Sequence, residues 1–191
     1  MKKLYNQIHV YAVVIMACTL LASCSQDLTH HEAINKNQRK IEDPERLDDA
    51  RFLVEARSFN LLDMRLAELA SENGYAASIV NLAKKDIETH EDLARDLNKL
   101  AAKEKIAIPD NMNEEHQSIL FELSKAERED FDQQYISALN RINDDITRRF
   151  TTMATQAKDA DIRAFAARRL GTLREQESLL SEVEDELMDT Y

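Results

Sequence analysis

Apolar residues recur every three or four positions over most of the chain, which is the spacing of amphipathic helices. The first helix is expected over 43–73, where an Asp-Pro pair at Asp43 supplies a capping carboxylate and a proline tolerated in the first turn. Gly74 is a plausible stop signal. The apolar stripe of this helix contains Phe52, Ala56, Phe59, Leu66 and Ala70.

The same spacing predicts three further long helices, at about residues 76–103, 124–157 and 159–187. Pro109 ends the second of them, and a short helical piece is expected at about 114–123, in the connection to the third. Four long helices with one face apolar must bury those faces against one another.

Composition supports this interpretation. The 191 residues include two Gly, two Pro and no Trp, which argues against sandwiches, barrels and glycine-loop nucleotide folds because all of them need frequent turns. A 43% hydrophobic content is enough to fill a core and argues against disorder. We therefore predict an all-α fold, an antiparallel four-helix bundle over residues 43–191 with a short extra helix in the second connection. A two-stranded coiled coil is disfavoured because turn signals break the stripe.

The N-terminus has the features of a secretory signal. Lys2 and Lys3 precede an apolar stretch at about residues 10–22, which is shorter than the roughly 20 residues of a membrane-spanning helix. The stretch ends in Leu-Ala-Ser-Cys at Cys24, which resembles the bacterial lipobox. This resemblance implies a lipoprotein signal peptide at 1–23, cleavage before Cys24 and acylation of that cysteine, with palmitate among the chains. The alternative is an ordinary secretory peptide with a chance cysteine.

Residues 24–42 are expected to be the lipidated cysteine and a flexible linker, since they are polar and show no helical period. The adjacent His30 and His31 are interpreted as part of that solvated linker. The two residues after Cys24 do not form an Asp-type inner-membrane retention signal, which favours the outer membrane. The lipid would make the membrane a partner of the folded domain. The sequence leaves open whether the domain lies on the periplasmic or the outer face of that membrane.

Four polar residues interrupt or border the apolar stripes, one from each long helix: Asp63, His90, Asn143 and Gln176. A carboxylate in such a place is costly unless it is paired or binds metal. The favoured interpretation is a hydrogen-bonded polar layer that satisfies buried groups and fixes helix register. A metal site that uses Asp63 and His90 is the alternative. Tyr135 is interpreted as a core aromatic residue with a satisfied hydroxyl rather than a radical or catalytic residue.

These residues also carry a resemblance. The chain resembles, over about residues 48–184, the bacterial domain-of-unknown-function 4142 family of secreted, ferritin-like four-helix bundles. The matching features are diffuse and are recognised by their order: Asp63 through Ala70, Ala83 through His90 to Leu97, Pro109, Phe131-Asp132 followed by Tyr135, and Ala166 through Leu173. The resemblance implies a ferritin-like fold, related to the di-metal carboxylate proteins, and no well-established activity.

Compared with that family, Asp63 stands where a Glu is usual and His90 matches a His. Asn143 and Gln176 stand where the family usually has His, so two imidazoles are replaced by amides, which bind transition metals poorly. An intact di-iron site needs about four carboxylates and two His. We therefore expect no cofactor and no catalytic residues, with iron, manganese or zinc at Asp63 and His90 as the alternative.

The formal net charge is −11, and becomes −13 once Lys2 and Lys3 leave with the signal peptide. Such an acidic chain is a poor ligand for nucleic acid. No Ser-His-Asp, Cys-His or glycine-rich phosphate motif is present. The sequence thus predicts a lipid-anchored, non-catalytic envelope protein that acts in envelope interaction or stress, through its acidic surface or an envelope protein partner. The alternative is a metal-binding or di-metal oxidase-type protein. Oligomeric state stays open.

Overall fold

The computed structural model describes residues 27–190, and this part of the chain is helical without strands. Its helices are α2 (His30–Lys40), α3 (Pro44–Asn73), α4 (Ala77–Glu104), α5 (Glu114–Ser124), α6 (Arg128–Gln156) and α7 (Ala160–Thr190). The four long helices and the short α5 confirm the predicted fold class. Within 27–190 no helix is long and apolar enough to cross a membrane. The predicted signal peptide and Cys24 lie outside the described residues.

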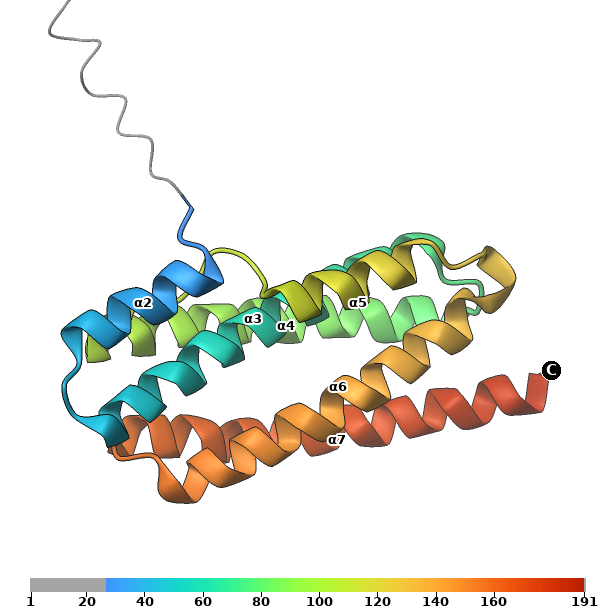
Figure 1. The fold of residues 1–191 in the computed structure, drawn as a ribbon. Coiled ribbons are helices and arrows are strands. Elements are labelled where there is room, and N and C mark those ends of the chain that lie inside the picture. Colours follow the sequence, from blue (N-terminus) through green and yellow to red (C-terminus); the bar gives the residue numbers. More distant parts are fainter. Residues whose placement is uncertain (1–26, 191) are drawn as a thin grey trace, which may run out of the picture.

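The long helices form two hairpins, α3–α4 and α6–α7, that pack side by side (Figure 1). Helix α5 runs back along the bundle, so that α6 begins at the same end of the bundle where α3 ends. Each long helix is therefore antiparallel to both of its neighbours. A bundle with one long crossover between its second and third long helices has the connectivity of ferritin-like folds.

Two buried aspartates lock the ends of the hairpins. Asp49 on α3 accepts hydrogen bonds from the backbone amides of residues 158–159, in the turn between α6 and α7. Asp132 on α6 accepts from the amides of residues 75–76, in the turn between α3 and α4. The four bonds measure 2.7–3.0 Å. Each hairpin thus holds the turn of the other hairpin. The residue numbers in the two sets of contacts differ by one constant offset.

The glycine after α3 permits a close approach between helices. A Cβ on Gly74 would lie 2.7 Å from the carbonyl oxygen of Ala70 and 2.9 Å from a side-chain carbon of Ile79. The predicted stop at this residue is confirmed, because α3 ends at Asn73. Aromatic edges fill the core near the other end, where the rings of Phe52 and Phe150 are 4.9 Å apart.

The prediction of a flexible linker over 24–42 is wrong for its described part. Thr29 and Glu32 form a reciprocal capping box that starts α2. Asn37 is 2% exposed. Its side-chain nitrogen donates to the backbone carbonyl of Ala107, and its side-chain oxygen accepts from the backbone N–H of Ala107, both at 2.8 Å. Residues from Leu28 onward therefore belong to the folded domain, because they pair with the connection between α4 and α5.

Candidate functional site

The structure brings the four predicted polar residues to one place in the bundle. Asp63 on α3, His90 on α4, Asn143 on α6 and Gln176 on α7 all line a cavity of about 10 Å³. That volume has room for about one water molecule. The remaining lining residues are Leu82, Asp86, Leu139 and Leu180. Asp63 and His90 are 6% and 3% exposed and therefore buried, whereas Asn143 and Gln176 are partly exposed.

Hydrogen bonds tie the polar cluster across three helices. The Gln176 amide nitrogen donates to Asp86 Oδ1 at 3.2 Å and lies 3.3 Å from His90 Nε2. The other imidazole nitrogen, His90 Nδ1, lies 3.2 Å from Asn60 Oδ1. Because an amide oxygen only accepts, Nδ1 carries the proton and Nε2 accepts from Gln176. The carboxylate of Asp63 approaches the same Nε2, with its Oδ2 at 3.6 Å.

Arg169 on α7 supplies the positive charge of the polar cluster. Its side chain is 7% exposed, and its guanidinium donates to Gln176 Oε1 at 3.4 Å. Electrostatic attraction to Asp63 and Asp86 raises the pKa of Arg169, although burial lowers it by more. In return the guanidinium favours the ionised form of both carboxylates.

Burial dominates the titration of the polar cluster. Desolvation, with a smaller contribution from the charge of Asp86, raises the pKa of Asp63 to about 7. Desolvation also raises the pKa of Asp86 to about 6, against the hydrogen bond from Gln176 and the charge of Arg169. Burial and then Arg169 lower the pKa of His90 to about 3, so its imidazole is neutral. Near neutral pH the cluster therefore approaches charge balance with one guanidinium and one or two carboxylates.

Three buried polar atoms around this point lack a hydrogen-bond partner within the described part of the protein: Asp63 Oδ1, the Tyr135 hydroxyl and Arg169 Nε. Burial, and then the charges of Asp86 and Asp63, raise the pKa of the Tyr135 hydroxyl well above the usual value. Tyr135 is fully buried, as expected for a core aromatic residue, but the prediction that its hydroxyl is hydrogen-bonded is wrong within the described residues. A single water in the cavity is the partner that its size allows for Asp63.

The donor set does not fit a di-metal centre. Such a centre takes about four carboxylates and two imidazoles, whereas the polar cluster offers two carboxylates, one imidazole and amides beside a guanidinium. Between residues 27 and 190, one group of three acidic side chains brings its oxygens within 4.8 Å of one another, namely Glu104, Asp159 and Asp161. It lies where α4 ends and α7 begins, and Lys103 pairs with Asp161 there.

A buried serine and histidine make the shortest side-chain contact between α3 and α5. Ser58 Oγ lies 2.7 Å from His116 Nδ1 and accepts from the amide of Asn113 at 2.9 Å. Ser58 is 0% exposed and His116 is 4% exposed. The buried Ser58 hydroxyl is not accessible to a substrate. The contact between Ser58 and His116 holds α5 against α3.

Sequence reasoning missed Asp86, Arg169 and Asn60 as members of the polar cluster. One signal was available, because Asp86 lies four residues before His90 and Arg169 lies seven before Gln176, both on the same helix face. Their charges suggested solvated positions, and only the crossing of α4 and α7 reveals that they face each other.

The fold and the polar cluster define a ferritin-like four-helix bundle with polar residues in its core. The family model described as domain of unknown function (DUF4142) matches residues 34–183. The chain belongs to this family, and the predicted resemblance is confirmed. The fold is similar to that of a DUF305 fragment from Deinococcus radiodurans, with a TM-score of 0.64 and 13% identity over 74% of this chain and 95% of that one. Curated proteins gave no match.

We predict that Asp63→Asn changes the pH dependence of stability. The folded pKa of about 7 lies above the ordinary 3.8, so wild-type stability is full below about pH 4 and falls as pH rises to about 7. Asparagine does not titrate. The free energy of unfolding, measured in urea, is therefore expected to rise in the variant relative to the wild type by roughly 2–4 kcal/mol as the pH increases from about 4 to about 8.

The exposed Asp92 provides the control, because Asp92→Asn should leave the pH profile unchanged. Parallel pH profiles for Asp63→Asn and the wild type would show that the carboxyl group of Asp63 titrates normally, against the electrostatics described above.

Proposed function

We propose that this chain is a lipid-anchored protein of the bacterial cell envelope, held in the outer membrane, whose bundle acts by binding rather than by catalysis. The charged start, the apolar stretch and the Leu-Ala-Ser-Cys motif at Cys24 support the anchor. Leu28, four residues further on, is already hydrogen-bonded to Asp110 through two contacts of 2.7 and 2.8 Å. Four extended residues reach about 14 Å, so the anchor would hold the bundle close to the membrane.

The observation that carries the non-catalytic role is the polar cluster, whose charges are compensated within the chain and whose cavity is small. Arg169 provides the counter-charge to Asp63 and Asp86 from within the chain. The cavity beside them, at about 10 Å³, has no room for a substrate. The cluster's place in the middle of the bundle suits a structural role, in which hydrogen bonds fix the register of α3, α4 and α7.

The anchor predicts how the full-length protein divides between detergent and water. After expression in a bacterium, the wild type should enter the detergent-rich phase of a Triton X-114 extract, and Cys24→Ala should lose the covalent acyl label seen after growth with a palmitate analogue. Cys18→Ala, which changes the cysteine within the predicted signal peptide, is the matched control and should retain the label. An unlabelled wild type would refute lipidation.

Metal binding by Asp63 and His90 is the second candidate function. One distance favours it: Asp63 Oδ2 and His90 Nε2 are 3.6 Å apart. Two ligand atoms of one tetrahedral zinc, each at about 2.0–2.1 Å, lie roughly 3.4 Å apart. The unpartnered Asp63 Oδ1 is a further available donor. Against it, Arg169 already provides positive charge beside both carboxylates, and Gln176 donates to the imidazole nitrogen that a metal would need.

Calorimetric titration of the metal-free protein with zinc, manganese and iron(II) separates the two functions. The binding role predicts no stoichiometric uptake that depends on the polar cluster. Uptake of about one ion per chain that Asp63→Asn and His90→Gln both abolish would instead establish the metal site, provided that circular dichroism shows both variants folded. Glu104→Gln controls for the acidic group at the end of α4.

A further inference from the structure

We propose that the groove over α6, bordered by α5 and α7, binds a cationic amphipathic helix of a partner protein. This inference rests on the proposed binding role and names the surface and the chemistry of the partner. The groove consists of two neighbouring cavities on the outside of the bundle, far larger than the cavity of the polar cluster.

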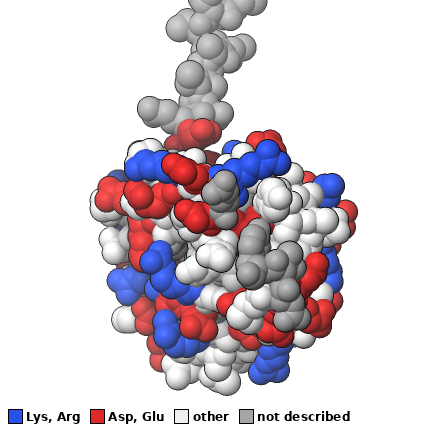
Figure 2. Space-filling view, turned by 90° about the vertical axis from the view of Figure 1, so that its right-hand side faces the viewer, with Lys and Arg blue, Asp and Glu red and all other residues white. Residues whose placement is uncertain are grey.

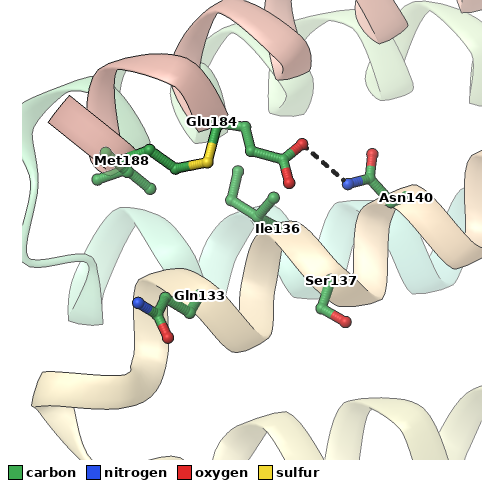
Figure 3. A pocket seen from close by; sticks show the side chains of 7 residues that line it. Gln133, Ile136, Ser137, Asn140, Glu184 and Met188 are labelled. Carbon is green, nitrogen blue, oxygen red and sulfur yellow. Dashed lines mark hydrogen bonds between the residues drawn. The ribbon is translucent and has the colours of Figure 1, made fainter.

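The two cavities adjoin along α6. The first, of about 520 Å³, lies between α6 and the last turns of α7, and the second, of about 660 Å³, lies between α5 and α6. They share Gln133 and Ser137, which are one helical turn apart on α6. Figure 3 shows Ser137 and Gln133 on one side of α6, directed away from Glu184 and Met188 of α7, and Asn140 bonded to Glu184 at 3.2 Å.

The floor of the groove is apolar. Leu187 and Ile136 form its base between α6 and α7, and Met188 stands above them with 67% of its surface exposed. On the α5 side the partly buried Ile119 and the buried Leu123 continue the floor. An exposed methionine beside aliphatic residues suits the apolar face of a helix, because its flexible side chain adapts to different partners.

The rim of the groove is acidic. Its carboxylates come from all three helices, namely Glu115, Glu122, Asp130 and Glu184, against the single cation Arg141. Residues 175–188 of α7 carry six carboxylates, Glu184 among them, and no Lys or Arg, although Glu175 pairs with Lys85 of α4. Figure 2 shows acidic and basic side chains interspersed around uncharged surface at the end of the molecule where α7 finishes.

This charge selects the occupant. An acidic rim repels nucleic acid, anionic lipid headgroups and a second copy of a chain whose net charge is −11. A helix with Leu or Met along one side and Lys or Arg along its flanks matches both the floor and the rim. The chemistry of the groove therefore identifies a basic amphipathic segment of another protein.

The test measures binding of a fluorescent Leu/Lys amphipathic helical peptide to the full-length protein in uncharged detergent micelles, with empty micelles as the blank. Saturable binding of one peptide per chain is expected, and a Leu/Glu peptide of the same pattern should not bind. Glu184→Lys should weaken binding about ten-fold. Ser137→Trp should weaken it by a similar factor because the indole fills the centre of the groove.

Glu91→Lys on α4 is the matched control, because it makes the same charge change on a helix that does not border the groove. It should change the dissociation constant less than about two-fold. Circular dichroism confirms that each variant is folded. Equal weakening by Glu91→Lys, an unaffected Ser137→Trp variant or the absence of saturable binding would each overturn the proposal. The proposal would also be overturned if light scattering showed that the protein is a dimer and that Ser137→Trp dissociates this dimer. A protein that carries the lipid but fails these tests refutes the groove and leaves the anchor intact.

Discussion

The burial of Arg169 opposite two carboxylates is the interaction on which the centre of this bundle depends. Asp63 and Asp86 come from different helices and are 6% and 7% exposed. Without a nearby positive charge, each would have to give up its ionised form or draw in water. Arg169 makes no direct ion pair with either carboxylate in the described part of the protein, so its effect on them is a through-space attraction in a poorly solvated place.

The polar contacts also explain why the helices have a single register. Gln176 joins α7 to α4 through Asp86 and His90, and Asn60 joins α4 to α3. At the ends of the bundle, Asp49 and Asp132 hold the turns of opposite hairpins. Polar bonds therefore fix the bundle in the middle and at both ends, while its apolar stripes supply the bulk of the buried surface. This rigid body leaves α5, α6 and the end of α7 to present a groove outward.

Much of the fold could be predicted because its signals are local. The apolar spacing and the residues around Asp43, Gly74 and Pro109 located all four long helices and α5. Helix α2 was missed because it packs on residues 105–113, far away in sequence, and its polar composition gave no stripe. Its capping pair, Thr29 and Glu32, was the available local signal.

Part of the candidate site was predictable for the same reason. Asp63, His90 and Gln176 stand out as polar residues on apolar stripes. Arg169 and Asp86 do not, since a charged residue beside a stripe is usually solvated. Their burial depends on how α4 and α7 cross, which no local pattern encodes.

A thermodynamic cycle tests the central claim, that Arg169 stabilises the bundle by compensating Asp63 and Asp86. Urea unfolding at pH 8 would compare Arg169→Met in the wild-type background with the same change in an Asp63→Asn, Asp86→Asn background. The account predicts that the loss in the first background exceeds the loss in the second by about 0.5–3 kcal/mol. Equal losses in both backgrounds would contradict it, because Arg169 would then contribute only its packing.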